Sequence, residues 1–427
     1  MSSLPHLRRS RWVMPVAPGS RVTRLELFYD LIFVFALLNV TALVARQVNV
    51  RGLLAGVVVM ALLWWCWTGF VALGNVARAD HGVLPLLGFG IMAGVFVLAI
   101  TLLQAFLDQP GDLPGPAVFA VAYLVVRALT LAGFAFVFSA AGHTRGQFLV
   151  TAVPPLVAGA LIALSVTVPW WVPAADVVTV RLVLWTAALL VEYAVGLFLP
   201  YARWTLPSAG HWAERHGLIV LIALGEAVIS LGFGPGQFNR LTLTTTVLIS
   251  CVLGIGLIAA LWWLHFDSLS ARVEQVLHGT RGEARIPLAR DVYTYLHLLL
   301  ILGVVATALG LKLLVEAVAT PRPVPRITNI ILHIGVALFL LAAAAVARRT
   351  FHGSGRARLL AGLFVAALAV PAIVIPPLVD LALLVAICGA LALVQRLAAD
   401  RRGVKTRLRE EERATEEAVS AWRHRHL

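Results

Sequence analysis

The stretch LELFYDLIFVFALLNV, residues 25–40, decides the fold class. Its run of Leu, Ile, Phe and Val suits a helix that spans lipid, yet it opens with two acids, Glu26 and Asp30, four residues apart on one helix face. An ionisable group inside a bilayer costs several kcal/mol, so such a group usually faces the interior of a helix bundle. We therefore expect Asp30 to face protein or water. Glu26 either does the same or pairs with Arg21 or Arg24 at the interface.

The composition of the whole chain agrees with a membrane protein. The chain has 427 residues, of which 60% are hydrophobic and 13% charged, and its mean hydropathy is +0.91. Soluble domains carry about 25% charged residues. Apolar blocks of about 20 residues, long enough to cross a hydrocarbon core of roughly 30 Å, recur along the chain. Because such blocks do not suit barrel strands, the sequence predicts an all-α, polytopic transmembrane helical bundle in a lipid bilayer.

About twelve spans are predicted. They cover residues 25–45, 52–76, 84–107, 116–140, 147–168, 177–199, 214–233, 242–266, 292–316, 327–347, 358–375 and 378–397. Three prolines, Pro371, Pro376 and Pro377, interrupt the last pair, which is either a full hairpin or a broken, re-entrant one.

The basic residues predict the orientation of these spans. Most of the 34 Lys and Arg fall in the termini and in alternate connecting segments, and such residues accumulate on the cytoplasmic side of a membrane. We expect a multi-pass plasma-membrane protein with both termini in the cytoplasm. Since this topology explains the net charge of +13, we expect no nucleic-acid partner.

The chain divides into four predicted parts. These are a basic cytoplasmic N-terminal segment (1–24), a first six-helix half (25–200), a second six-helix half (201–397) and a charged cytoplasmic C-terminal tail (398–427). LIFVFALLNV (31–40) and LIVLIALGEA (218–227) match at four of ten positions, which suggests a 6+6 parallel pseudo-repeat. Chance agreement between apolar strings is the alternative.

One acid is predicted to lie near the centre of the bilayer. In HWAERHGLIVLIALGEAVISLG, residues 211–232, Glu226 follows Glu214 by about 18 Å at 1.5 Å per residue. Its small neighbours let another helix approach, which places Glu226 toward the bundle interior. We predict that Glu226 is the key carboxylate of a substrate or proton pathway. The other residues assigned to this pathway are Asp30, Asn39, His297, Glu26, Glu214 and Arg215.

Other polar residues within spans have simpler explanations beside a functional one. Arg127 and Glu192 both fall near mid-depth, and we predict that they form a buried structural ion pair between two helices. His297 titrates near neutral pH and so is a candidate proton carrier. A hydrogen bond between helices would explain His297 equally well.

Three stretches of the chain resemble the bacterial low temperature requirement protein A family. They are LELFYDLIFVFAL (25–37), HWAERHGLIVLIALGEAVISLG (211–232) and YLHLLLILGVVATALG (295–310). The family carries an ELFFDLVFVFA-like string, in which Tyr29 replaces the second Phe here, and an H-x-x-E-R-x-G-L-x-x-x-x-x-L-G-E string. The second string maps onto His211, Glu214, Arg215, Gly217, Leu218, Leu224, Gly225 and Glu226. The resemblance implies a membrane protein and the same acids to watch, but its name records growth in the cold and implies no substrate.

Three classes of function fit these features. The first is a secondary transporter of a small solute, coupled to protons in one version. The second is a non-catalytic membrane sensor or structural protein. The third, an intramembrane enzyme acting on a lipid-linked substrate, is less favoured because HExxH, G-x-S-x-G and phosphate-cradling motifs are absent from the sequence. We expect no cofactor and no metal, and the sequence leaves substrate, direction, coupling ion and oligomeric state open.

Overall fold

The computed structural model describes most of the chain. It covers residues 14–16, 19–106, 113–141, 145–198, 206–232, 244–267, 269–319, 326–351 and 355–401, together with 410, 413–414, 417 and 420–421. The chain splits into two compact units, unit 1 (Met1–Ser208) and unit 2 (Ala209–Leu427). The predicted N-terminal segment and C-terminal tail fall largely outside the described residues. Their cytoplasmic placement and the 6+6 repeat stay predictions.

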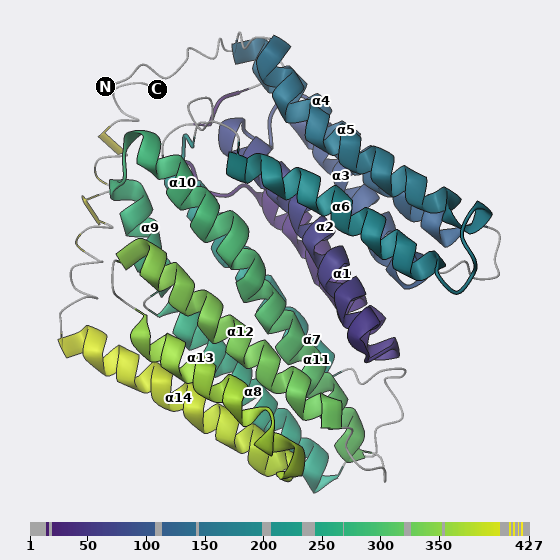
Figure 1. Cartoon of the computed structure of the whole chain (residues 1–427). Helices are drawn as coiled ribbons and strands as arrows, with labels where there is room; N and C mark the ends of the chain where they lie inside the picture. Colours follow the sequence, from purple (N-terminus) through teal and green to yellow (C-terminus); the bar gives the residue numbers. More distant parts are fainter. Residues whose placement is uncertain are drawn as a thin grey trace. The chain divides into compact units, whose positions relative to one another are not determined.

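Six long helices build unit 1 (Figure 1, purple to teal). They are α1 (Arg24–Arg46), α2 (Val50–Val76), α3 (Leu84–Thr101), α4 (Gly115–Ala141), α5 (Arg145–Thr167) and α6 (Val177–Phe198), with the 3-10 helices η1 (Leu102–Gln104) and η2 (Val168–Trp170). The start of α2 is defined by Asn49, whose side chain accepts a hydrogen bond of 2.9 Å from Gly52 N. Such an N-cap satisfies an N–H group that has no partner within the helix.

Unit 2 contains the remaining helices (Figure 1, green to yellow). They are α7 (Ala209–Gly232), α8 (Thr245–Phe266), α9 (Leu269–Gly279), α10 (Arg285–Ala289), α11 (His297–Ala319), α12 (Arg326–Phe351), α13 (Arg356–Leu368) and α14 (Pro377–Arg401). Shorter turns join them: the 3-10 helices η4 (Gly282–Ala284) and η6 (Pro371–Val374), and the π-helix η5 (Arg290–Leu296).

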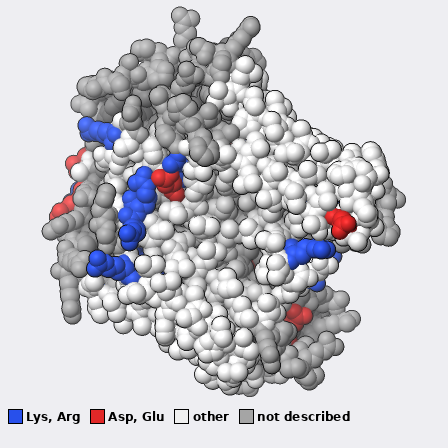
Figure 2. Space-filling view, in the orientation of Figure 1, with Lys and Arg blue, Asp and Glu red and all other residues white. Residues whose placement is uncertain are grey.

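The helices carry apolar side chains on their outer faces. In α1, Leu27, Phe28 and Leu31 are exposed, whereas Tyr29 and Asp30 are fully buried. Most of the described surface in Figure 2 is uncharged, and charged side chains occur there in small groups. A soluble protein would show the reverse pattern, so these faces are suited to lipid.

By length and composition, eleven helices in the described part of the chain can cross a membrane. The regular secondary structure described there is helical, apart from a bridge between Pro15 and Ala77. These findings confirm the prediction of an all-α, polytopic membrane bundle. The predicted span 358–375 differs in detail, because α13 has 13 residues, a length of about 20 Å. Pro371, which cannot donate a backbone hydrogen bond, opens η6 directly after it.

Glycines allow the backbones of α11 and α12 to touch. A Cβ atom added to Gly303 would lie 2.5 Å from Phe339 N, and one added to Gly335 would lie 2.4 Å from Thr307 N. Both neighbours are backbone atoms, which cannot move aside as a flexible side chain can. Small residues at helix interfaces increase van der Waals contact, which drives helix association in lipid.

We predict that Gly335→Ala destabilises unit 2 by about 1–3 kcal/mol, the usual effect of overpacking a tight interface. The measurement is the free energy of unfolding in detergent micelles. Gly389→Ala in α14 is the matched control, because its added Cβ would meet no atom within 4 Å. Equal stability of the two variants would contradict the proposed close packing.

Candidate functional site

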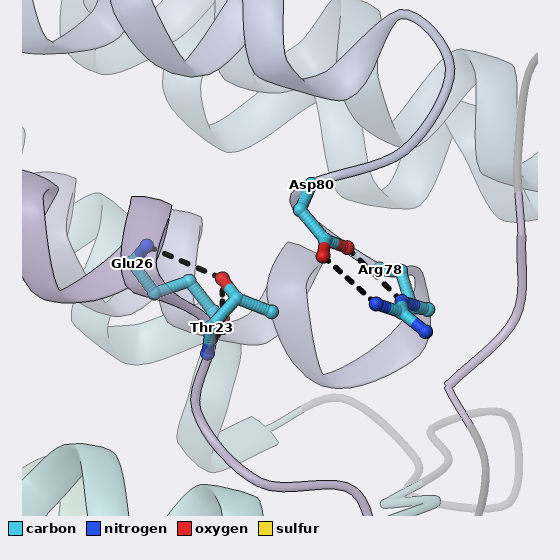
Figure 3. Close-up of polar contacts among 4 residues, drawn as sticks. All are labelled: Thr23, Glu26, Arg78 and Asp80. Atoms are coloured by element: carbon cyan, nitrogen blue, oxygen red, sulfur yellow. Dashed lines mark hydrogen bonds and ion pairs between the residues drawn. The ribbon is translucent and has the colours of Figure 1, made fainter.

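Glu26, the first acid of α1, caps its own helix. The side chain is 1% exposed. Its carboxylate accepts hydrogen bonds from Thr23 N at 2.8 Å and from the Thr23 hydroxyl at 2.9 Å, and Glu26 N donates to Thr23 Oγ1 at 3.3 Å. This reciprocal arrangement is a capping box (Figure 3). The cap accounts for the position of Glu26, and its pathway role stays a prediction.

Asp30 faces inward, one turn further along α1. Trp67 of α2 donates its indole N–H to Asp30 Oδ1 at 2.8 Å, and both side chains are fully buried. An indole is a donor only, so this contact suits a carboxylate that accepts. The sequence analysis singled out Asp30 but not Trp67.

Asn39 serves its own helix. The side-chain amide donates to Phe35 O, four residues earlier, at 2.9 Å, and the residue is half-buried. A hydrogen bond to the i−4 carbonyl satisfies a polar side chain within a spanning helix without a second helix. The structure therefore provides Asn39 with a local partner.

Arg127 of α4 and Glu192 of α6 are in direct contact. The distance between Arg127 Nη2 and Glu192 Oε1 is 2.6 Å, and the two side chains are 10% and 1% exposed. Gly69 of α2 lies beside the guanidinium: a Cβ there would be in ordinary van der Waals contact with Arg127 Nη1, at 3.5 Å. The structure places the two residues in contact, and the structural role predicted for the pair stays a prediction.

The motif residues at the start of α7 differ in their exposure. Glu214 is exposed, whereas Arg215 and His211 are buried at 0% and 2% exposure. Consecutive residues on an α-helix point about 100° apart, so adjacent side chains take opposite environments.

Glu226 lies on the buried face of α7. The side chain is fully buried, and the Ser230 hydroxyl donates to Glu226 Oε1 at 2.5 Å. Lys312 of α11 is also buried, and its charge interacts with Glu226. The carboxylate thus accepts a hydrogen bond from a hydroxyl of its own helix and lies within range of the charge of a lysine on the neighbouring helix.

Three buried histidines gather between α7, α8 and α11. The ring centroid of His297 lies 5.6 Å from that of His216 and 5.8 Å from that of His265. The Tyr293 ring stacks on His297 at 4.9 Å. His265 is buried as well, at 2% exposure. Among the described residues, no group of three or more His, Cys, Asp or Glu is arranged to hold a metal ion.

Backbone carbonyls determine which nitrogen of two of these rings carries a proton. His216 Nδ1 lies 2.8 Å from Trp212 O, and His297 Nδ1 lies 2.9 Å from Val292 O. A carbonyl oxygen can only accept, so both Nδ1 atoms carry hydrogen and Nε2 is the atom that can gain or lose a proton. Val292 lies in the π-helix η5, in which a carbonyl faces the residue five positions later, here His297. Short π-helical segments within helices are frequent at functional sites.

A further buried pair, His333 of α12 and Asp380 of α14, was not predicted from the sequence. The available signal was that each is an ionisable residue inside or next to a predicted span. The apolar residues around each of them define the spans but do not indicate that the two side chains meet.

Outside the spans, Arg78 and Asp80 form a bidentate pair in the α2–α3 connection (Figure 3). Arg78 Nε and Nη2 lie 3.0 and 2.8 Å from the two carboxylate oxygens of Asp80. The hydrogen bonds from Arg78 lower the pKa of Asp80, while Asp80 raises the pKa of Arg78. The charge of Glu26 also acts on both groups.

Comparison with known proteins identifies relatives of the chain. The sequence model of the bacterial low temperature requirement A protein matches residues 21–393. An uncharacterized protein of Rhizobium meliloti (strain 1021) is 28% identical over 296 residues, which is 67% of this chain and 67% of that protein. No solved structure matches the chain significantly.

We predict that Asp80→Asn removes an acid-sensitive part of the stability. Because the folded-state pKa of Asp80 is lowered, its contribution is present above the pKa of an unfolded Asp and is lost as pH falls through the lowered value. The pair is partly exposed, so the effect is at most about 1 kcal/mol. Unfolding midpoints between pH 7 and pH 3 should differ between parent and variant at neutral pH and converge in acid. A constant difference would contradict the assignment.

We predict that Arg127 and Glu192 are energetically coupled. Removing one partner leaves a buried charge, so Glu192→Gln should destabilise the protein by about 3–5 kcal/mol. Adding Arg127→Gln should restore part of that loss. A double-mutant cycle of unfolding free energies measures the coupling, and additive losses would refute it.

Proposed function

The chain belongs to the bacterial low temperature requirement A protein family, and from this premise we propose that it is a secondary transporter that couples a small solute to protons through Glu226. The chain is an integral membrane protein, and each ionisable side chain that it buries inside the bilayer costs free energy. The observation that carries the proposal is the fully buried Glu226 carboxylate, which accepts a hydrogen bond from Ser230 and interacts with the charge of Lys312.

The surroundings of Glu226 suit a change of protonation. Ser230 can donate to the carboxylate and can also accept from a carboxylic acid, so the hydroxyl serves both forms. Lys312 favours the ionised form of Glu226 by charge, and burial favours the neutral form. A solute that approaches Lys312 or Ser230 would shift this balance, which is the requirement for coupling.

The packing of α7 against α11 supports a path toward Glu226. His216 and Glu226 both lie on the buried part of α7, ten residues and therefore about 15 Å apart along the axis. His297 of α11 is adjacent to His216. These histidines present Nε2 as the exchangeable atom, so they are suited to pass protons between one end of unit 2 and its centre.

The polar groups of unit 1 favour a different role. Glu192 is matched to Arg127, Asp30 to the Trp67 indole, and Glu26 to the backbone at its own helix end. Such contacts hold helices together, as the alternative of a structural membrane protein requires. The transport proposal therefore depends on unit 2.

We predict that Glu226→Gln abolishes proton-coupled uptake but leaves the protein folded, since Gln keeps the size and hydrogen-bonding capacity of the side chain. Purified protein is reconstituted into vesicles that contain a pH-sensitive dye, and amino acids, sugars, carboxylates and amines are added one at a time. Proton influx that the parent shows should fall to the level of empty vesicles in the variant. Asp400→Asn, an exposed acid of α14 that is not assigned to the pathway, is the control and should retain parental influx.

A complementation assay in cells can contradict the proposal. A strain that lacks the gene and grows poorly in the cold is complemented with either variant at equal expression. Full rescue by Glu226→Gln, together with parental influx in vesicles, would contradict a functional carboxylate.

A further inference from the structure

The second buried pair of unit 2 joins α12 to α14. His333 Nε2 lies 3.4 Å from Asp380 Oδ1, and both side chains are fully buried. Among the described residues, His333 Nε2 and both carboxylate oxygens of Asp380 have no hydrogen-bond partner. The 3.4 Å contact between the two side chains is within ion-pair distance and is longer than an ordinary hydrogen bond. Each side chain is therefore the polar partner of the other's buried atoms.

The other ring nitrogen shows where protons must be. His333 Nδ1 lies 2.9 Å from Asn329 O, and since a carbonyl can only accept, Nδ1 carries hydrogen. In a neutral ring Nε2 would then present a lone pair to the carboxylate. Two lone pairs repel, so the contact requires one proton, carried either by Nε2 or by Asp380. In both forms the pair is neutral overall, which suits a buried apolar site.

Local contacts hold the pair in place. Asn329 Nδ2 donates to Ala372 O in η6 at 2.8 Å, and Asp380 N donates to Pro376 O at 3.0 Å. These bonds connect the start of α12, η6 and the first turn of α14. Both sides of the pair are thus positioned by the backbone.

The charged groups on neighbouring elements lie at different levels. On α11, Gly310 packs against Leu332, next to His333, so Lys312 and Glu316 are the ionisable groups nearest this level. The η6 segment, Pro371–Val374, carries no ionisable residue. On α8, Gly256 packs against Val385, so Cys251 lies near the level of Asp380. The other ionisable groups on elements packed against α12 or α14 lie toward the opposite end: Arg290, Asp291, Tyr293 and Tyr295 of η5, Arg272, Glu274 and His278 of α9, Arg356 and Arg358 of α13, and His265 of α8.

We propose that His333 and Asp380 form a proton-binding site that holds one proton between α12 and α14. Loss of that proton would leave a buried carboxylate facing a lone pair, so release requires the two side chains to separate. The proton leaves to water as α14 moves away from α12, and no bond other than the N–H or O–H bond is broken. This site stands whether or not the protein carries a solute through Glu226.

Two variants separate a shared proton from an ordinary polar contact. In Asp380→Asn the amide N–H donates to Nε2 without any bound proton, so folding should survive and unfolding midpoints should not change with pH at this site. In His333→Gln the remaining Asp380 must stay protonated to remain buried, so the unfolding midpoint should drop as pH rises. Asp400→Asn, exposed on the same helix, is the control.

Spectroscopy of the full chain in detergent micelles observes the proton directly. Histidine labelled with nitrogen-15 reports protonation at Nε2, and the His333→Gln spectrum identifies the signal of His333. The infrared spectrum reports a carboxylic acid. We expect either a protonated Nε2 or a carboxylic-acid band in the parent, unchanged between pH 5 and pH 8, and its loss in Asp380→Asn. A bare Nε2 together with an ionised Asp380 in the parent would overturn the proposal, even if His333→Gln fails to fold.

Discussion

Polar side chains in a membrane-spanning bundle must turn toward partners inside the protein, because the surrounding hydrocarbon offers them no hydrogen bond. The hydrogen bond from Trp67 to Asp30 shows the consequence for a single helix. The acid turns toward α2, and Phe28 and Leu31 are left on the exposed face. The same requirement explains why Asn39 bonds to its own backbone. Helix rotation in this protein is thus decided by a few polar groups, while the many apolar residues tolerate either environment.

The two units meet this requirement with different chemistry. In unit 1 the partners of the acids are a guanidinium, an indole and a backbone end, none of which changes protonation near neutral pH. In unit 2 the buried groups include histidines, a lysine and carboxylates that can exchange protons. We infer that unit 1 supplies fixed contacts and that unit 2 contains the proton chemistry. Both proposals, at Glu226 and at the pair of His333 with Asp380, follow from this difference.

Backbone carbonyls contribute more to this chemistry than hydropathy suggests. His216, His297 and His333 each donate Nδ1–H to a carbonyl four or five residues earlier. The contact determines the tautomer and leaves Nε2 as the exchangeable nitrogen, which in His333 lies 3.4 Å from Asp380 of α14. The backbone of the helix thus fixes the orientation of a ring whose Nε2 can exchange a proton. Two of these histidines, His297 and His333, lie on α11 and α12, whose close approach is made possible by Gly303 and Gly335.

The sequence alone determined the fold class and eleven of the spans, because the length of an apolar block is a local, strong signal. It predicted a pair of Arg127 with Glu192 from two isolated opposite charges within spans, and the tertiary structure places the two side chains in contact. It also identified Glu226 as a buried acid. Only the tertiary structure decided which partners those groups have, since Trp67, Ser230 and Lys312 carry no pattern that distinguishes them from other residues. The pair of His333 and Asp380 lies 47 residues apart in sequence, and a contact of that kind exists only after the helices have packed.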